Sequence, residues 1–325
     1  MIVTLTPNPS IDATMELDSP LQRGQVIRPV SISQVAGGKG INVSHALVLA
    51  GVESTALFPA DEGDPFLTLV AKTGIPYRHV PVTESVRINT TLTENDGTTT
   101  KINGAGATLD SQARQQVEEF LISLLGANAT YLVLAGSLPP GVPLDWYTSL
   151  LALVRSKFPD LPIAVDTSDE AIASLGRNLN IAAPTLIKPN GLEIGQMVGA
   201  DGDAIESAAA EGNFVPAIRA GRQVVDRGVA EVLVTLGPAG AVLVTEAGAW
   251  VATPPPTNVV STVGAGDSSL AGYLIARSQG DSPAECLRRA VAYGSAAASL
   301  AGTTIPSPSQ LNMAGTTVHD LSHEI

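Results

Sequence analysis

The sequence predicts an α/β protein with a mainly parallel central sheet, helices on both faces of that sheet and a small β lid beside it. Three patterns support this fold class. Short apolar segments alternate with longer helical segments, the apolar segments contain few polar residues, and two further segments alternate polar with apolar residues. Uninterrupted apolar strands are typical of a parallel sheet buried on both faces, whereas strict alternation is typical of a half-exposed antiparallel sheet.

Strands of the main sheet are expected where short runs are rich in Val, Leu and Ile. These runs are residues 2–6, 55–58, 131–135, 163–166, 185–188 and 232–236. Helices are expected where apolar residues recur at helical spacing. The helical segments are residues 41–50, 111–125, 144–157 and 204–227, followed by two Ala-rich helices in succession, 267–278 and 283–301.

The lid is expected from residues 13–35 and 87–104, which alternate polar and apolar residues. The second segment contains Asn95-Asp96-Gly97, and Asp-Gly is a strong hairpin-turn signal. The Pro-rich run at 253–256 is too short to separate two domains, and the chain contains no repeat. We therefore expect residues 1–325 to form a single domain with the lid inserted into it.

Composition and charge restrict the class of protein. Hydrophobic residues make up 44% of the chain, which excludes a disordered protein, and a single cysteine, Cys286, excludes a disulfide framework. The net charge is −13, so no nucleic-acid partner is expected. No apolar run approaches the roughly 20 residues of a membrane span, and the amino terminus lacks a basic signal-peptide region. We therefore expect a cytoplasmic protein without membrane contact.

The strongest chemical signal is S-T-V-G-A-G-D at residues 261–267, directly before an apolar helical segment. Glycines at a helix start let backbone N–H groups converge on an anion, and the helix dipole adds positive potential. An aspartate in the first turn could take a proton from a hydroxyl while those amides hold a phosphoryl group. An ordinary helix start fits the same residues, with Asp267 near the amino-terminal end of the helix and Gly264 and Gly266 in the turn before it.

A second glycine-rich segment, G-G-K-G-I-N-V at residues 37–43, also opens a helical pattern. Its backbone amides, together with Lys39 and Asn42, suit a polyhydroxylated or phosphorylated ligand. It lacks the Ser or Thr that follows the lysine of a Walker A loop. A flexible turn carrying a solvated lysine is the alternative.

Asn190 and Glu193 follow a predicted strand and share one face if a helix starts there. An amide and a carboxylate so placed could hold a hydrated Mg²⁺ beside nucleotide phosphates. The pair also fits a helix cap, with Asn190 as the N-cap and Glu193 three residues later, and spacing alone slightly favours the cap.

Two weaker signals lie at the ends of predicted strands. T-L-G-P-A-G at residues 235–240 could pass under a nucleotide or form a plain hairpin turn. Asp12 follows the first strand, at the edge where open parallel sheets bind ligands. A lone aspartate at such a position is as often a turn residue as a sugar ligand.

Taken together and in this order, these motifs resemble the ribokinase-like (PfkB) carbohydrate kinases. G-G-K-G-I-N-V and S-T-V-G-A-G-D-S look like the two signatures of that family, and the likeness runs from T-P-N-P-S-I-D to the Ala-rich terminal helices. The resemblance implies a ribokinase-like three-layer α/β/α sandwich that uses ATP and Mg²⁺. It also implies a homodimer, because the lid of this family usually forms the dimer interface.

By this resemblance, Asp267 is the general base and the amides of Gly264, Ala265 and Gly266 form an anion hole. The residues implied on the sugar-phosphate side are Asp12, Gly38, Lys39, Asn42, Arg87, Lys101 and Ser137. Those implied for the nucleotide phosphates and the metal, the metal being held through water, are Lys188, Asn190 and Glu193. The ATP loop falls on Thr235, Leu236, Gly237, Pro238, Ala239 and Gly240, beside Gly266 and Asp267.

Within the family, Lys39 and the segments 87–97 and 136–141 resemble the members that phosphorylate fructose 1-phosphate and their tagatose-6-phosphate kinase relatives. Residues 57–61 look more like the branch that uses fructose 6-phosphate. We expect ATP-dependent phosphorylation of fructose 1-phosphate to fructose 1,6-bisphosphate, with tagatose-6-phosphate or fructose-6-phosphate kinase activity as alternatives. A non-catalytic sugar-phosphate-binding regulator is the alternative from another class. A dinucleotide oxidoreductase is disfavoured because the first strand–helix junction lacks G-x-G-x-x-G.

Overall fold

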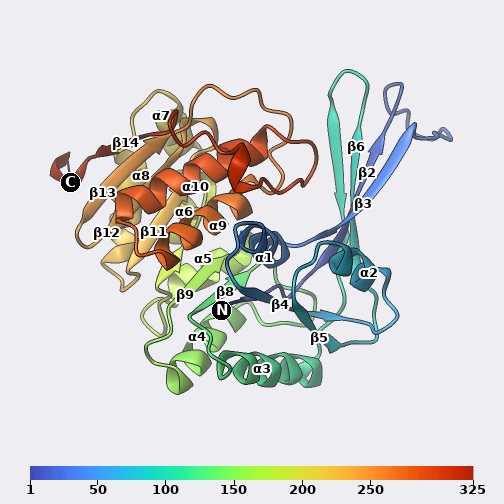
Figure 1. Cartoon of the computed structure of the whole chain (residues 1–325), viewed down its shortest axis with the longest axis horizontal. Coiled ribbons are helices and arrows are strands. Elements are labelled where there is room, and N and C mark those ends of the chain that lie inside the picture. Colours follow the sequence, from blue (N-terminus) through green and yellow to red (C-terminus); the bar gives the residue numbers. More distant parts are fainter. Residues whose placement is uncertain (325) are drawn as a thin grey trace.

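The computed structural model describes residues 1–324 and contains two β-sheets (Figure 1). The main sheet has ten strands in the order β14-β13-β12-β11-β10-β9-β8-β1-β4-β5. Its strands from β11 to β5 run parallel: β1 (Ile2–Leu5), β4 (Ser54–Ala60), β5 (Tyr77–Pro81), β8 (Tyr131–Ala135), β9 (Ile163–Asp166), β10 (Leu186–Ile187) and β11 (Glu231–Thr235). Three antiparallel strands complete one edge: β12 (Ala241–Thr245), β13 (Gly248–Thr253) and β14 (Thr317–Asp320).

Helices cover both faces of the main sheet. One face packs against α3 (Ser111–Leu125), α4 (Trp146–Lys157), α5 (Asp169–Arg177), α6 (Gly191–Val198), α7 (Gly202–Ala210) and α8 (Val215–Val225). The other face packs against α1 (Lys39–Leu49), α9 (Ala265–Ser278) and α10 (Pro283–Ala298). Alternate residues of one strand enter opposite cores: Val3 and Leu5 lie in the first and Ile2 in the second. The expected three-layer α/β/α sandwich is therefore confirmed.

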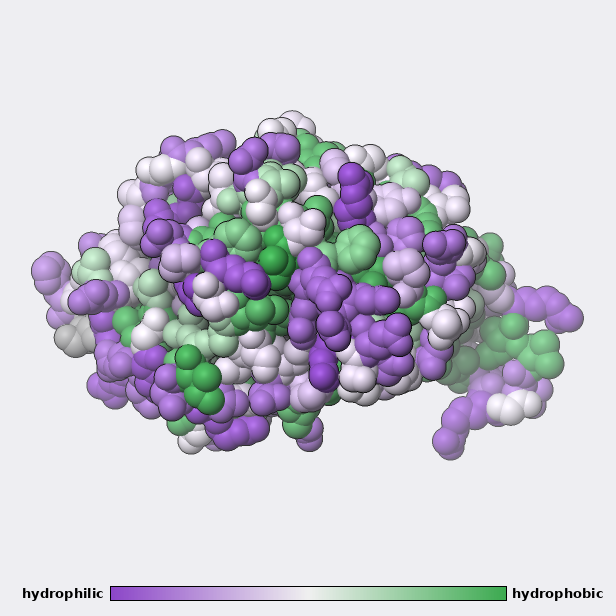
Figure 2. All heavy atoms as spheres, turned by 90° about the horizontal axis from the view of Figure 1, so that it is seen from below, coloured by the Kyte–Doolittle hydropathy of each residue, from purple (hydrophilic) through white to green (hydrophobic). Residues whose placement is uncertain are grey.

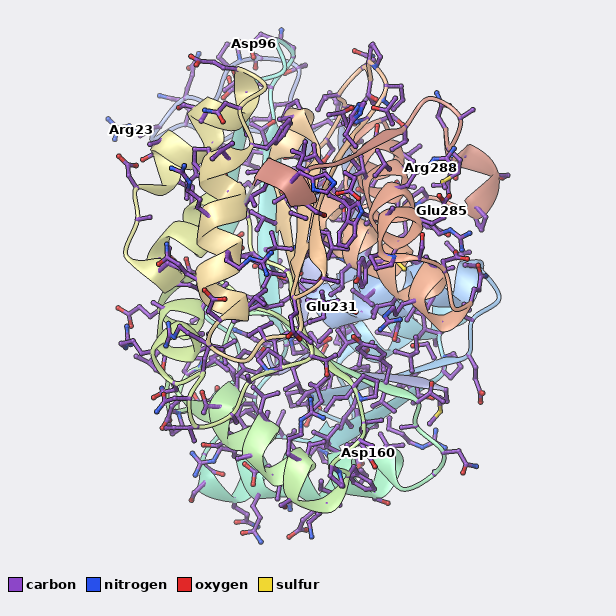
Figure 3. All side chains as sticks on the ribbon, turned by 90° about the vertical axis from the view of Figure 1, so that its left-hand side faces the viewer. Arg23, Asp96, Asp160, Glu231, Glu285 and Arg288 are labelled. Atoms are coloured by element: carbon purple, nitrogen blue, oxygen red, sulfur yellow. The ribbon has the colours of Figure 1, made fainter. Side chains whose placement is uncertain are left out.

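The second sheet, called here the small sheet, has four strands in the order β3-β2-β6-β7. They are β2 (Ser10–Glu16), β3 (Ser31–Gly37), β6 (Arg87–Thr93) and β7 (Thr99–Asn103), and the sheet projects from the main body (Figure 1). Helix α2 (Pro65–Lys72) packs beside its base through a third apolar cluster. Arg23, in the β2–β3 connection, and Asp96, in the β6–β7 turn, lie at the same end of the molecule (Figure 3).

The two faces of the small sheet differ in polarity. In the register, Asp12 lies beside Asn89 and Thr91 beside Lys101, so these residues and Arg87 share one polar face. The opposite face carries Ile32, Ile88 and Ile102, which are 60%, 50% and 59% exposed. Figure 2 shows hydrophobic atoms on the surface of the part that projects from the main body. An exposed apolar face on a four-stranded sheet is a candidate interaction surface.

The structure corrects several predicted boundaries. The helix expected at 204–227 is wrong, because α7 ends at Ala210 and α8 begins at Val215. The side chain of Asn213 accepts a hydrogen bond from Val215 N, and Pro216 occupies the first turn of α8, so a new helix starts there. The strand expected at 185–188 shortens to two residues, and the last helix ends at Ala298. The antiparallel edge strands β12 to β14 were not predicted.

The polar segments expected at 13–35 and 87–104 fall within the small sheet, whose strands begin at Ser10 and reach Gly37. Within residues 1–324, no helix combines the length and apolar character needed to cross a bilayer.

Candidate active site

Asp267 lies in the first turn of α9, at the carboxyl-terminal edge of the main sheet. Gly264 is the N-cap of this helix and has a φ of 77°, a left-handed conformation that favours glycine. The N–H groups of Gly264, Gly266 and Asp267 have no hydrogen-bond acceptor within residues 1–324. These free amides and the positive end of the helix dipole form a ready anion site beside the Asp267 carboxylate.

The Asp267 side chain is buried and is held by one defined contact. Asn42 Nδ2, from α1, donates a hydrogen bond to Asp267 Oδ2 over 2.8 Å. Burial raises the pKa of Asp267, and the nearby positive charge of Lys39 opposes that rise. Asn42 therefore fixes the orientation of a carboxylate whose affinity for a proton exceeds that of an ordinary aspartate.

Two lysines share one buried carboxylate, Asp166, at the end of β9. Lys39 Nζ lies 2.7 Å from Asp166 Oδ1, and Lys188 Nζ lies 3.2 Å from Asp166 Oδ2. The second contact is an ion pair without hydrogen-bond alignment, so Oδ2 has no hydrogen-bond partner in the described chain. Burial alone would raise the pKa of Asp166, but the charges of Lys188 and Lys39 lower it. Asp166 is therefore the anchor that holds both lysines beside Asp267.

Lys39 is surrounded by carboxylates. Burial alone would lower the pKa of its ammonium group, but Asp166 above all, and then Asp267 and Glu193, raise it well above the usual value. Lys39 therefore stays protonated and balances part of the negative charge of this cluster.

Asn190 and Glu193 form the helix cap that the sequence spacing slightly favoured. Glu193 N donates to Asn190 Oδ1 over 2.7 Å, and Asn190 N donates to Glu193 Oε2 over 2.8 Å. This capping box leaves Glu193 Oε1 free, and both side chains line the cavity described below. Burial raises the pKa of Glu193.

The donor set fits a hydrated magnesium ion better than a directly ligated one. No cluster of three or more His, Cys, Asp or Glu side chains converges as a metal site among the described residues. Glu193 lines the cavity, and the Oε1 atom that its capping box leaves free is a hard oxygen acceptor suited to the water shell that Mg²⁺ retains. The residues present therefore fit a Mg²⁺ ion held through water beside a nucleotide.

A cavity of about 970 Å³ extends from Asp267 along the edge of the main sheet. Its polar end is lined by Lys39, Lys188, Asn190, Glu193, Gly266 and Asp267. Leu192, Val259 and the prolines at 254–256 contribute apolar surface. The volume and the mixture of polar and apolar lining are typical of a site for a ligand of nucleotide size.

The segment 235–240 contributes only part of what the sequence suggested. Thr235, Gly237, Pro238 and Gly240 line the cavity. Leu236 is instead buried in the core, and Ala239 packs against that core. The side chains of Leu236 and Ala239 thus support the loop from behind.

A second polar group surrounds Asp12 on the small sheet. Ser10 Oγ donates to Asp12 Oδ1 over 2.7 Å, and Asn89 Nδ2 donates to the same oxygen over 3.1 Å. A Cβ on Gly37 would lie 2.3 Å from Asp12 Oδ2, so glycine alone fits there. Burial raises the pKa of Asp12, while these hydrogen bonds and the charges of Arg87 and Lys101 moderate the rise.

Arg87 and Lys101 lie on the same face but do not face each other. Lys101 pairs with Thr91, four residues along β6 from Arg87, so the backbone positions of the two residues are offset by about 13 Å along the strands. The hairpin turn therefore does not place these two residues opposite each other, and they lie on either side of Asp12 along the polar face. Arg87 donates to Gly104 O over 3.3 Å, and its Nε is buried without a partner in the described chain.

The remaining predicted positions lie between these two groups. Gly38 is the N-cap of α1 and directly follows β3, so it connects the Asp12 group to Lys39. Asn8 Nδ2 donates to Ala105 O over 3.0 Å and approaches Ser137 Oγ at 3.4 Å. Asn8 thereby ties the loop after β7 to the loop after β8, where Ser137 lies.

Sequence reasoning missed three polar residues of these groups: Asp166, Asn8 and Asn89. Asp166 ends a predicted apolar strand, and a carboxylate at that edge of a parallel sheet is a general signal for a site. Asn8 lies in the T-P-N-P-S-I-D segment, and Asn89 lies in the R-I-N-T-T segment. Neither asparagine has a local pattern that reveals a partner about 77 or more residues away, as their contacts with Asp12 and Ser137 require.

Fold and site together define a phosphotransferase of the carbohydrate kinase class, and comparison with known proteins agrees. A family model described as pfkB family carbohydrate kinase matches residues 5–310. The chain is 34% identical over 308 residues to a 1-phosphofructokinase of Haloferax volcanii, covering 94% of this chain and 93% of the relative. It is 32% identical over 311 residues to the ATP-dependent 6-phosphofructokinase isozyme 2 of Escherichia coli, covering 94% of each.

Among solved structures, phosphofructokinase-2 from Escherichia coli in complex with substrates and products is similar, with a TM-score of 0.82 and 30% identity. The similarity covers 95% of this chain and 96% of that one. The chain therefore belongs to the pfkB family of carbohydrate kinases, and its sandwich is the ribokinase-like fold that the sequence predicted.

Proposed function

We propose that this protein transfers the γ-phosphoryl group of ATP to a hydroxyl of fructose 1-phosphate, giving fructose 1,6-bisphosphate. The observation that carries the proposal is the placement of Asp267. A buried carboxylate of raised pKa lies in the first turn of α9, beside free backbone amides at the polar end of a nucleotide-sized cavity. The relative named as an ATP-dependent phosphofructokinase supports ATP as the donor.

In this mechanism Asp267 accepts the proton of the acceptor hydroxyl as its oxygen attacks the phosphorus atom. The free amides of Gly264, Gly266 and Asp267 stabilise the charge on the phosphoryl oxygens, an interaction that is strongest in a buried, preorganised site. The amide of Ala265, which the family resemblance also implied for this role, instead donates to Thr262 O over 3.4 Å. Lys188 adds positive charge, since its Nζ lies 3.2 Å from where a Cβ of Gly266 would be. Mg²⁺ bound with the nucleotide would be held through water by Asn190 and Glu193 and would neutralise phosphate charge.

The polar face of the small sheet is the proposed acceptor site. Asp12 accepts hydrogen bonds and suits sugar hydroxyls, while Arg87 and Lys101 supply positive charge on either side of it. The unpartnered Nε of Arg87 supports a role in binding an anion, because a buried donor without an acceptor is unfavourable. Gly38, Asn42 and Ser137 complete the path from this face to Asp267.

Fructose 6-phosphate and tagatose 6-phosphate are second candidates for the acceptor. The segment L-F-P-A-D at the end of β4 resembles the branch that uses fructose 6-phosphate. Identities of 34% and 32% to the two named phosphofructokinases do not separate these acceptors.

The proposal is tested by measuring ADP release with ATP, Mg²⁺ and a panel of acceptors. The panel contains fructose 1-phosphate, fructose 6-phosphate, tagatose 6-phosphate and fructose, and the product is identified by phosphorus NMR. We expect the highest kcat/KM with fructose 1-phosphate and a 1,6-bisphosphate product. A higher kcat/KM with either 6-phosphate would reassign the acceptor. Sugar-phosphate binding without any ADP release would show a non-catalytic regulator.

We also propose that the small sheet acts as a lid and pairs with that of a second copy through its apolar face. Ile32, Ile88 and Ile102 are half or more exposed on that face, and burial against an identical face would remove them from water. Light scattering should show a dimer for the parent protein and a monomer for Ile88→Glu. A parent protein that is monomeric at high concentration would exclude this interface.

A further inference from the structure

Lys39 lies in the Asp166–Asp267 cluster, whereas the family resemblance implied a position on the sugar-phosphate side. It is the first residue of α1, and its side chain is 29% exposed and lines the nucleotide-sized cavity. Its ammonium group donates to Asp166 Oδ1 over 2.7 Å. An ammonium group has three N–H donors, so two donors of Lys39 remain after this contact.

The charges around each cation divide the site into two groups. The carboxylates that act on Lys39 are Asp166, Asp267 and Glu193. Lys39 lines the same cavity as Gly266 and Asp267, whereas Asp12, Arg87 and Lys101 are not among the described residues that line it. Lys39 therefore belongs electrostatically with the general base and the nucleotide, whereas Arg87 and Lys101 belong with the acceptor sugar.

Asp166 arranges Lys39 and Lys188 as a pair. Each oxygen of its carboxylate holds one ammonium group, so the two positive charges stand apart on either side of a fully buried anchor. Lys188 lies over the first turn of α9, where the free amides are. The three carboxylates that act on Lys39 and the two ammonium groups give the cluster one net negative charge. Both lysines are therefore needed to offset the carboxylates when an anionic phosphoryl group binds.

We propose that Lys39 contacts the transferred phosphoryl group rather than the phosphate that the sugar already carries. The inference rests on the proposed kinase activity. During transfer, the acceptor O–H gives its proton to Asp267, the acceptor oxygen bonds to phosphorus, and the bond to the ADP oxygen breaks with its electron pair leaving on ADP. Lys39 stays protonated throughout and donates to the oxygens on which charge accumulates.

A binding experiment tests this without turnover. Calorimetry compares ADP with a non-hydrolysable ATP analogue, which differs by the γ-phosphoryl group, in the parent protein and in Lys39→Met. We expect Lys39→Met to weaken analogue binding by roughly tenfold or more and to leave ADP binding within about twofold. Equal affinity changes for both nucleotides, or none, would overturn the proposal. Arg87→Ala is the matched control and should leave both nucleotide affinities unchanged.

A kinetic experiment distinguishes contact between Lys39 and the transferred phosphoryl group from contact with the phosphate that the sugar already carries. If Lys39 contacts the transferred group, Lys39→Met lowers kcat/KM for fructose 1-phosphate and for unphosphorylated fructose by the same factor, about 10²-fold. A loss confined to fructose 1-phosphate would instead assign Lys39 to the phosphate on the sugar. Lys39→Arg keeps the charge and should recover part of the analogue affinity, and it replaces Lys39→Met if that variant does not fold. Absence of transfer in the parent protein would refute the kinase proposal while the calorimetry still decides on Lys39.

Discussion

The Asp166–Asp267 cluster and the polar face of the small sheet differ in how their charged groups are held. At the main sheet, Asp166 is fully buried and holds two lysines, and Asn42 fixes Asp267. On the small sheet, Lys101 is exposed, and Arg87 Nε and Asn89 Oδ1 are buried without partners in the described chain. The lysines of the first region are held by ion pairs with a buried carboxylate, whereas Arg87 and Lys101 form no ion pair within residues 1–324.

By this proposal the Asp166–Asp267 cluster determines the type of reaction, and the polar face of the small sheet determines which acceptor is used. Phosphoryl transfer depends on groups held in fixed geometry, which rigid elements supply. In the proposed function, recognition of one phosphosugar among similar ones depends on a few side chains on the polar face of the small sheet. Substitutions in the two regions should therefore have distinct kinetic effects.

The largest effect is expected for Asp267→Asn. The near-isosteric amide can still accept the hydrogen bond from Asn42 but cannot accept the acceptor proton. We expect kcat to fall by about 10²-fold or more, the usual scale of general-base catalysis, with unchanged ADP affinity and melting temperature. Turnover within about threefold of the parent protein would remove Asp267 from this role.

Arg87→Ala should have the next largest effect, and it should change KM for the phosphosugar rather than kcat. Loss of a desolvated charged contact costs about 2–5 kcal/mol, so KM for the phosphosugar should rise roughly 30-fold or more. KM for ATP should change by less than about twofold. Lys101→Ala is the matched comparison: its exposed charge should contribute less than about fivefold. Equal changes in the KM values for sugar and ATP would contradict a separate acceptor site.

The pH dependence of kcat/KM should reflect the titration of Asp267. The pKa of Asp267 is raised, so its carboxylate becomes protonated and loses its base function at a higher pH than an ordinary aspartate. We expect kcat/KM to fall about tenfold per pH unit on the acid side, beginning above the usual aspartate range. Asp12, whose pKa is also raised, is a second candidate for this limb, so Asp12→Asn is the control. A profile flat down to the usual aspartate range would contradict the assignment.

Glu193→Gln should have the smallest effect. Glutamine can keep the capping box with Asn190, so the melting temperature should stay the same. Loss of the negative charge should raise the Mg²⁺ concentration for half-maximal rate by several-fold, because the water shell of the ion loses a charged partner. If stability falls while the Mg²⁺ response is unaltered, Glu193 is only a helix cap.

The same contrast explains what the sequence could predict. Strands such as β8 and β9 and helix α3 have the predicted bounds, because apolar runs and helical spacing are local signals. The start of α9 and the cap at Asn190 also depend on local signals, because Gly264 directly precedes α9 and Glu193 lies three residues after Asn190. The break between α7 and α8 was missed because its residues, Asn213 and Pro216, also fit a continuing pattern of apolar positions.

Long-range contacts could not be predicted in this way. Asp166 meets Lys39 across 127 residues, and Asn42 meets Asp267 across 225. The spacing of Arg87 and Lys101 depends on the β6–β7 register, which the turn sequence alone did not fix. Local motifs therefore located many of the residues that line the cavity, while the fold determined which of them contact one another.

The division of labour between the two regions is tested most directly by one paired measurement. The kcat/KM for fructose 1-phosphate and the affinity for a non-hydrolysable ATP analogue are determined for the parent protein, Arg87→Ala and Lys39→Met. We predict that Arg87→Ala lowers kcat/KM roughly 30-fold or more with unchanged analogue affinity, whereas Lys39→Met weakens analogue binding roughly tenfold or more. If Arg87→Ala weakens the analogue, or Lys39→Met leaves it unchanged, the two regions do not divide donor and acceptor as described.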